Sequence, residues 1–258
     1  MALLDTKDVS INFGGLWAVK DVDFSIGTDE IVGLIGPNGS GKTTFLNIIS
    51  GLYRATNGAV TLRGEDITSL RPFEIFQRGI ARTYQSSRLC WDLSVADNIL
   101  MGLYTKHKVG FADIIFRPKK ADNEIYEFLQ ECMDMLSYFN PSLFKLRYDL
   151  TKNIPHIDRR RIEICRALVG HPTVLLLDEP TAGLNDEETM QMMMDIHKIK
   201  RKIKDICIII IEHDMKVMER VPERIVVFNA GRKIAEGIYG DIVKDHDVIN
   251  AYLGGAAV

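Results

Sequence analysis

The chain has 258 residues, of which 46% are hydrophobic and 26% charged, and its formal net charge is −3. A chain of this length and composition can bury a full hydrophobic core, as one large domain or two small ones, and we expect an ordinary soluble protein. The slightly negative charge gives no overall attraction to nucleic acid, so we expect no nucleic acid partner.

The cysteines and the apolar runs give no sign of a secreted or membrane-spanning chain. Cys90, Cys132, Cys165 and Cys207 are scattered without a C-x-x-C pair, so we expect reduced, packed thiols. The first residues lack the pattern of a signal peptide, and apolar runs such as Ile206–Ile211 are far shorter than a bilayer span. Any membrane association is therefore expected to come through a partner.

The N-terminal part of the chain begins with strand patterns. Val9–Phe13 and Val22–Ile26 alternate apolar and polar residues and are separated by Gly14-Gly15, which is typical of a hairpin. Further strand patterns lie at Ile31–Ile35, Ala59–Arg63 and Ile80–Tyr84.

A glycine-rich segment joins the apolar run Ile31–Ile35 to the helical pattern Phe45–Ile49. Its sequence is Gly36-Pro37-Asn38-Gly39-Ser40-Gly41-Lys42-Thr43-Thr44. On a strand-to-helix turn, this pattern is the phosphate-binding loop, in which glycines and the helix N-terminus present backbone N–H groups to a polyphosphate. Lys42 would supply charge for the β- and γ-phosphates, and the Thr43 hydroxyl would ligate Mg²⁺.

The pattern changes to helical spacing between Ser86 and about Asn153. Apolar residues recur at that spacing at Ile125, Phe128, Leu129, Cys132, Leu136 and Phe139. We interpret the stretch as an inserted helical subdomain, and its Met and aromatic stripe as core rather than as a ligand site.

Strand patterns return in the last third of the chain, at Val174–Leu177, Ile206–Ile211, Arg224–Phe228 and Lys233–Ala235. The segment Glu187–Lys204 is predicted to be a helix between two of these strands, with Met190, Met193, Met194 and His197 on one side. Buried apolar strands that alternate with helices indicate a mainly parallel α/β sheet.

Polar residues follow three of the predicted strands. Asp178 and Glu179 come directly after Val174–Leu177, where ligands bind outside the carboxyl ends of parallel strands. Asp178 would hold Mg²⁺ through water, and Glu179 would polarise the attacking water. His213, after the next long strand, is a candidate γ-phosphate contact. Gln85 could complete the Mg²⁺ shell, although by itself it is also consistent with an exposed residue.

The order of these parts resembles the ATP-binding cassette (ABC) ATPases. The segments Ile80–Gln85, Ala182–Asn185, Ile211–Lys216 and Ala251–Gly254 are similar to those of the ATPase subunits of branched-chain amino-acid importers. The resemblance implies an α/β P-loop NTPase fold in a single ABC ATPase domain over residues 1–258. Residues 1–87 and 166–258 would form the nucleotide-binding core with an N-terminal antiparallel β subdomain, and residues 88–165 the helical insert.

The same resemblance implies the function and the partners. The chain would be an ATPase that binds ATP and Mg²⁺, dimerises head to tail and drives a separate transmembrane permease. A solute-binding protein would deliver the solute to this permease. It would lie peripherally on the cytoplasmic side of the inner membrane. By this analogy Phe13 would stack on adenine, Ala182–Asn185 would contact the partner ATPase, and the groove near Gln85 would seat the permease.

The sequence departs from the family where the signature Leu-Ser-Gly-Gly-Gln is expected. This chain has Ile154-Pro155-His156-Ile157-Asp158 there. Pro155 has neither a hydroxyl nor an N–H, and Asp158 adds negative charge, so we expect a poor clamp for the γ-phosphate of the opposite subunit. Alternatively, His156 and neighbouring amides form a divergent clamp, or Asp158 simply caps the helix.

A poor signature favours an asymmetric heterodimer, in which a second ATPase subunit supplies an intact signature to the site of this chain. A second hypothesis is a nucleotide-gated regulatory cassette that hydrolyses ATP weakly. A third is a soluble ABC ATPase that acts on ribosomes or DNA, which the single cassette and the absence of a basic bias disfavour.

Overall fold

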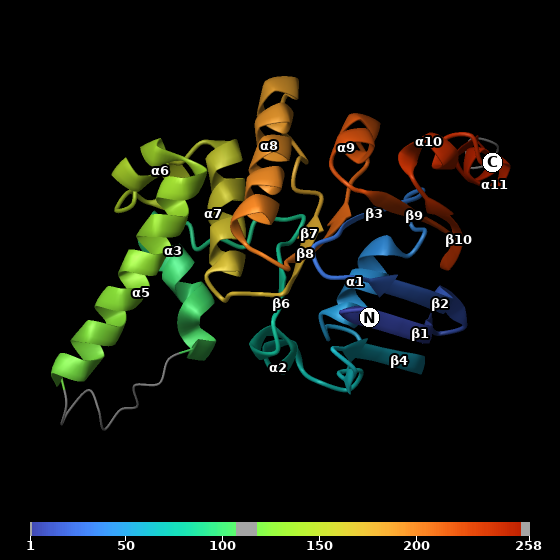
Figure 1. Ribbon diagram of the computed structural model, residues 1–258, viewed down its shortest axis with the longest axis horizontal. Coiled ribbons are helices and arrows are strands. Elements are labelled where there is room, and N and C mark those ends of the chain that lie inside the picture. Colours follow the sequence, from blue (N-terminus) through green and yellow to red (C-terminus); the bar gives the residue numbers. More distant parts are fainter. Residues whose placement is uncertain (1, 107–117, 254–258) are drawn as a thin grey trace.

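The core of the protein is a six-stranded sheet with helices on both faces (Figure 1). The computed structural model describes residues 2–106 and 118–253. The strand order is β10 (Arg232–Gly237), β9 (Arg224–Asn229), β3 (Ile31–Ile35), β8 (Cys207–Ile211), β7 (Val174–Asp178) and β6 (Ile80–Arg82). All neighbours are parallel except β9 and β10, as the sequence predicts for a mainly parallel sheet.

Alternate residues of the buried strands face two separate hydrophobic cores. Ile31 and Ile35 of β3 pack in the core that includes α7 (His156–Leu168), α8 (Asp186–Lys202) and α9 (Met215–Arg220). Val32 and Leu34 point to the other face, where they pack with α1 (Lys42–Ile49). A strand buried on both faces needs a continuous apolar run, which explains why β3, β7 and β8 lack polar residues before their ends.

A second sheet of four antiparallel strands covers the α1 face, in the order β2 (Leu16–Ile26), β1 (Leu4–Phe13), β4 (Asn57–Leu62) and β5 (Glu65–Asp66). The predicted N-terminal hairpin is therefore confirmed as β1 and β2. This sheet supports α1, the helix that follows β3, because the sheet and α1 pack in the same hydrophobic core.

The middle of the chain is helical. Its elements are α2 (Pro72–Gln77), α3 (Val95–Leu100), η1 (Met101–Lys106), α5 (Pro118–Phe139), α6 (Pro141–Lys145) and η2 (Thr151–Asn153). Cys132, Leu136 and Phe139 of the predicted apolar stripe are buried in the core that α7 and α8 share, so the stripe is core as expected. The side chain of Ile125 lies outside the described part of the chain.

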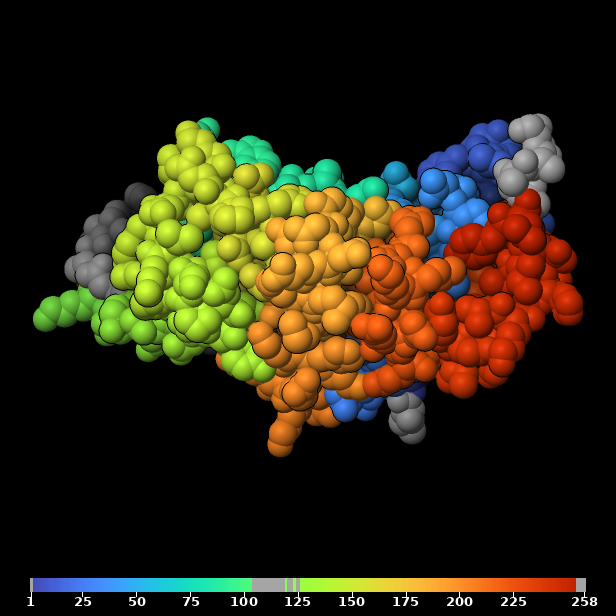
Figure 2. All heavy atoms as spheres, turned by 90° about the horizontal axis from the view of Figure 1, so that it is seen from above, coloured from blue at the N-terminus to red at the C-terminus, as the bar shows by residue number. Residues whose placement is uncertain are grey.

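The side of α8 that carries Met190, Met193, Met194 and His197 is only partly buried. Met193 is buried, but Met190 and Met194 are exposed, because the helix buries Met192 and Ile196 instead. The last two helices, α10 (Tyr239–Ile242) and α11 (His246–Leu253), lie at the opposite end of the molecule from α5 and α6, with α8 between them (Figures 1 and 2). Within the described ranges, no helix is long and apolar enough to span a membrane.

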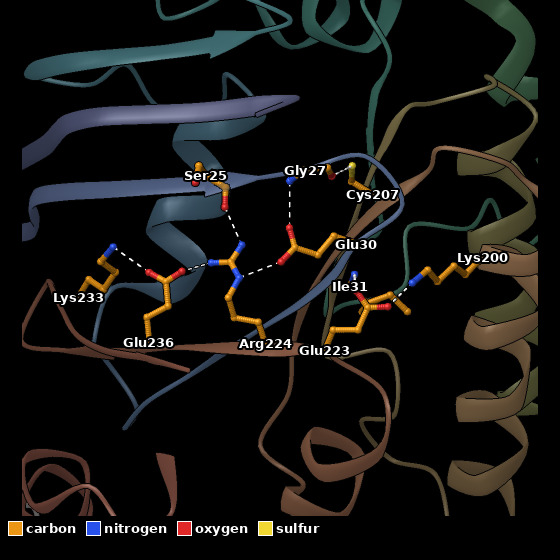
Figure 3. Close-up of polar contacts among 10 residues, drawn as sticks. All are labelled: Ser25, Gly27, Glu30, Ile31, Lys200, Cys207, Glu223, Arg224, Lys233 and Glu236. Carbon is orange, nitrogen blue, oxygen red and sulfur yellow. Dashed lines mark hydrogen bonds and ion pairs between the residues drawn. The ribbon is translucent and has the colours of Figure 1, made fainter. Parts of the chain in front are cut away.

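A network of charged residues joins the two sheets where β3 and β9 begin (Figure 3). Arg224 donates to a carboxylate oxygen of Glu30 at 2.8 Å and to the Ser25 carbonyl at 2.7 Å, and it also pairs with Glu236. Glu30 accepts a second hydrogen bond, from the N–H of Gly27, at 2.9 Å. The end of β2 is thereby fixed to the first residues of the core strands.

Replacement of Glu30 tests this network. Burial opposes the charge of Glu30, but hydrogen bonds from Arg224 and Gly27 outweigh it and hold the pKa of Glu30 below its ordinary value. A carboxyl group whose pKa is lower in the folded state stabilises that state at pH values above its unfolded pKa of about 4.3. This stabilisation is lost as the pH falls through the folded-state pKa. In urea unfolding at pH 7, Glu30→Gln should lower the unfolding free energy by about 1–2 kcal/mol. The difference in unfolding free energy between the wild type and Glu30→Gln should become smaller below about pH 4.3.

A matched control is Asp92→Asn, which breaks the exposed ion pair of Asp92 with Lys152. It should cost less than about 0.5 kcal/mol. A loss for Glu30→Gln that does not change with pH would contradict the electrostatic origin of the effect.

Candidate functional site

The glycine-rich loop leaves β3 and packs directly on the backbone of two other strands. Gly36 has a φ of +144°, and a Cβ there would lie 2.1 Å from the carbonyl oxygen of Phe228 in β9. At Gly41, which precedes the first residue of α1, a Cβ would lie 2.4 Å from the Ala18 carbonyl oxygen of β2. Only glycine fits at these two positions. The close contact of both glycines with neighbouring strands fixes the shape of the loop.

Lys42 opens α1, and its side chain folds under the loop. The ammonium donates to the carbonyls of Gly36 at 2.7 Å and Pro37 at 3.0 Å, and the residue is only 5% exposed. Burial lowers the pKa of Lys42, and the nearby charges of Glu179 and Asp178 offset this only in part. Because its direct partners are neutral carbonyls, the ammonium suits an anion in the loop.

The structure brings most of the predicted site residues to one cavity of about 400 Å³. The cavity is lined by Ala18, Asn38, Gly39, Ser40, Gly41, Lys42, Thr43, Thr44, Gln85, Glu179 and His213. Residues more than a hundred positions apart in the chain therefore face the phosphate loop together.

Glu179 is held between two of these residues. Gln85 donates through Nε2 to one carboxylate oxygen at 2.8 Å, and Nε2 of His213 lies 2.9 Å from the other. The backbone of Glu179 has a φ of +50°, and its N–H donates to the Ile211 carbonyl at 2.9 Å. A carboxylate fixed in this way beside a phosphate loop can orient a water molecule and accept its proton.

Gln85 reaches the cavity although β6 is shorter than predicted. The strand ends at Arg82 rather than at Tyr84, and the carbonyls of Tyr84 and Gln85 accept hydrogen bonds from Arg160 at 3.2 and 2.8 Å. The chain therefore leaves the sheet before Gln85 and turns this residue toward Glu179.

Asp178 is the last residue of β7 and is 2% exposed. One carboxylate oxygen accepts a hydrogen bond from Arg82 at 2.6 Å, and the other is buried without a partner among the described residues. Asp178, Thr43 and Gln85 line a second cavity of about 350 Å³. Their carboxylate, hydroxyl and amide oxygens are the hard ligands that magnesium prefers.

Within the described residues, no group of three or more His, Cys, Asp and Glu side chains could hold a metal ion. Magnesium is often bound by one or two carboxylates together with substrate phosphates, so a single buried aspartate still fits this ion. The donor set therefore suits a metal that arrives with a nucleotide rather than one held by the protein alone.

Phe13 does not line either cavity. It is 48% exposed at the end of β1, and its ring meets Tyr53 edge to face at 5.4 Å. Its stacking on adenine stays a prediction.

The segment Ile154–Asp158 divides between core and surface. Ile154 and Ile157 are buried, whereas Pro155 and His156 are exposed. Pro155 precedes α7 and gives it no side-chain cap. Asp158 is the third residue of the helix, and its carboxylate accepts hydrogen bonds from Arg161 at 2.8 Å and Asn140 at 3.3 Å. It therefore does not cap the helix, and its charge lies in the first turn.

Two charged residues of the site were not predicted from the sequence. Arg82 pairs with Asp178, and Glu212 is 4% exposed and accepts hydrogen bonds from the N–H and hydroxyl of Thr181 at 2.8 and 2.6 Å. Burial raises the pKa of Glu212, and the charge of Glu179 acts in the same direction, against the hydrogen bonds from Thr181. The signal in the sequence that could have identified both residues is a charged residue at the end of an apolar strand pattern.

The loop between β3 and α1, the acidic pair after β7 and the histidine after β8 define a P-loop ATPase. Comparison with known families agrees. Residues 19–182 match the family described as ABC transporter, and the chain belongs to this family, whose ATP-binding proteins are ATPases. Residues 232–258 match the description branched-chain amino acid ATP-binding cassette transporter.

Curated relatives align over nearly the whole chain. The high-affinity branched-chain amino acid transport ATP-binding proteins BraF of Pseudomonas aeruginosa and LivG of Escherichia coli are 34% and 36% identical to it, and each alignment covers 98% of both sequences. The lipopolysaccharide export system ATP-binding protein LptB of Haemophilus influenzae is 31% identical with the same coverage. Among solved structures, the ADP conformation of MJ1267, an ATP-binding cassette of an ABC transporter, has a TM-score of 0.84 at 26% identity and covers 98% of this chain and 99% of its own.

Two glycines of the loop provide a matched test of its packing. Alanine at Gly36 would meet the Phe228 carbonyl and would also adopt a positive φ, whereas at Gly39 the φ is +76° but no atom lies within 4 Å of the added Cβ. Gly36→Ala should cost about 3 kcal/mol or more in urea unfolding, and Gly39→Ala about 1–2 kcal/mol. Equal losses would show that the contact with β9 does not shape the loop.

Proposed function

We propose that this chain is the ATP-hydrolysing subunit of a multi-subunit importer for an amino acid, an amide or a similar small polar solute. The observation that carries the enzymatic part is Glu179, held by Gln85 and His213 beside the phosphate loop. Support for an amino-acid importer comes from the match of residues 232–258 and from the names of BraF and LivG. LptB belongs to an export system, so the proposed direction of transport rests on the resemblance to the branched-chain amino-acid importers.

In this proposal the loop from Gly36 to Thr44 binds the triphosphate through its backbone amides, and Lys42 contacts the β- and γ-phosphates. Thr43, Gln85 and Asp178 hold Mg²⁺, which neutralises phosphate charge when it is bound.

Two residues then act on the γ-phosphate. Glu179 orients the attacking water and accepts its proton, and His213 contacts the leaving phosphoryl group. Phe13 stacks on the adenine in the same proposal.

The permease would dock in a groove of about 420 Å³ beside the nucleotide site. Its lining combines aromatic and apolar side chains with charged ones, namely Phe73, Phe76, Met101, Arg82, Tyr84, Arg88, Glu163 and Arg166. Because it would dock on a transmembrane permease, we place the protein on the cytoplasmic face of the inner membrane. Within the single domain 1–258, we assign residues 88–165 to a helical subdomain, so the groove would lie at its border with the core.

We further propose that the chain pairs with a second, different ATPase subunit. Pro155, which precedes α7, and His156, its first residue, are exposed, and the first turn carries Asp158, which pairs with Arg161. Proline supplies no N–H, and a carboxylate repels phosphate, so this segment suits a γ-phosphate poorly. A partner with an intact signature would complete the site formed by Lys42 and Glu179.

The same segment gives a second candidate function, in which ATP binding closes the interface and this chain hydrolyses ATP slowly or not at all. Both functions predict ATP binding, and they differ in the role of Glu179.

Glu179→Gln separates the two functions in the complex of this chain, the second ATPase subunit and their permease. Loss of the water-orienting carboxylate should lower both ATP hydrolysis and solute uptake by about a hundredfold or more, while ATP binding is retained. The readouts are phosphate release and uptake of labelled solute into proteoliposomes. The control is Glu187→Gln, because Glu187 is exposed in the first turn of α8. Nearly unchanged hydrolysis with Glu179→Gln would reject the enzymatic role and support gating.

A further inference from the structure

Arg82 connects three parts of the nucleotide site. It lies at the end of β6, and its guanidinium donates to Asp178 at 2.6 Å, to the side-chain oxygen of Asn47 at 2.7 Å and to the hydroxyl of Ser50 at 3.0 Å. Asn47 belongs to α1, and Ser50 follows that helix directly. One side chain therefore joins the helix of the phosphate loop to the acidic end of β7.

The ion pair is buried on both sides. The side chain of Arg82 is 4% exposed and that of Asp178 is 2% exposed. Removal of one partner of a buried ion pair leaves the other group without its hydrogen bond and without charge compensation, so Arg82 is the residue that fixes the orientation of this carboxylate. Substitution of Arg82 would leave the carboxylate uncompensated.

The pair leaves one acceptor of Asp178 free. Arg82 holds Oδ2, and no donor among the described residues reaches the buried Oδ1. Asp178 lines the cavity that Thr43 and Gln85 also line. An orphaned carboxylate oxygen beside a hydroxyl and an amide is the kind of group that a hydrated magnesium ion would satisfy.

We propose that Arg82 is a positioning residue for the metal of the nucleotide site: by bonding Oδ2 it holds Asp178 turned so that Oδ1 serves Mg²⁺. The inference rests on the proposed function, since it concerns the metal that accompanies ATP. Arg82 acts through Asp178 and touches neither the metal nor the nucleotide. Outer partners that orient a metal ligand commonly change metal affinity by about 10–100-fold.

The test measures how strongly Mg²⁺ improves nucleotide binding, with a fluorescent, slowly hydrolysed ATP analogue as the probe. Its dissociation constant is determined in EDTA and in excess Mg²⁺, and the ratio of the two isolates the contribution of the metal. Arg82→Met should reduce this ratio by about tenfold or more. Binding in EDTA should change by less than about twofold, because the loop amides and Lys42 are unaltered.

Arg88→Met is the matched control. Arg88 lies over the ring of Tyr84 at 4.4 Å, as Arg82 does at 5.1 Å, and both line the same two cavities. Within the described chain, only Arg82 of the two is bonded to Asp178. The control should therefore keep the wild-type ratio.

Arg82→Lys keeps the positive charge but has one ammonium in place of the two guanidinium nitrogens that bond Asn47 and Asp178, and it serves if the methionine variant does not fold. It should reduce the ratio by about threefold or more. A wild-type ratio in the folded variants, or tighter binding in Mg²⁺, would overturn the role of Arg82, and tighter binding would mean that the arginine competes with the metal. Failure of the wild-type chain to bind the probe under either condition would instead reject the proposed function.

Discussion

The nucleotide site depends on the parallel register of β3, β8 and β7. Leu34 pairs with Ile211, and Ile211 pairs with Asp178, so these residues form one row across the three strands. Each chain segment that follows this row therefore leaves the sheet at the same edge: the phosphate loop after β3, the histidine after β8 and Glu179 after β7. A shift of one strand by a single residue would turn its buried side chains to the wrong face, so the two hydrophobic cores fix this register.

The charges of the site are arranged around buried groups that are only partly satisfied. Lys42 is bonded to neutral carbonyls, and Asp178 leaves one oxygen without a partner in the described structure. Both groups are better matched by a phosphate and its metal than by the protein alone. Arg82 lines both the neighbouring groove and the second cavity, which Thr43, Gln85 and Asp178 also line, so the proposed docking surface adjoins the proposed metal site.

Local sequence patterns predicted much of this arrangement. The apolar runs of β3, β7 and β8 and the glycine loop are contiguous in sequence, and the residues that follow parallel strands must meet at one sheet edge. The pair of Arg82 with Asp178 could not be found this way, because it joins residues 96 positions apart through side-chain packing. The end of β6 at Arg82 is likewise not marked in the local sequence: the carbonyls that follow it bond to Arg160 of α7, which lies far along the chain. The exposure of Met190 and Met194 depends on how α8 is rotated on its neighbours, which periodicity within the helix does not fix.

We propose that this chain carries the residues that bind and hydrolyse ATP but has no competent clamp for the γ-phosphate held by a partner. The most direct measurement is the ATPase rate of the purified chain, alone and mixed with the ATPase subunit encoded beside it, at equal total protein. We expect the chain to bind ATP alone and mixing to raise the rate by about a hundredfold, since the partner supplies the missing phosphate donors. An ATP-dependent homodimer that hydrolyses ATP as fast as the mixture would show that Ile154–Asp158 forms a working clamp and would contradict the asymmetric pairing.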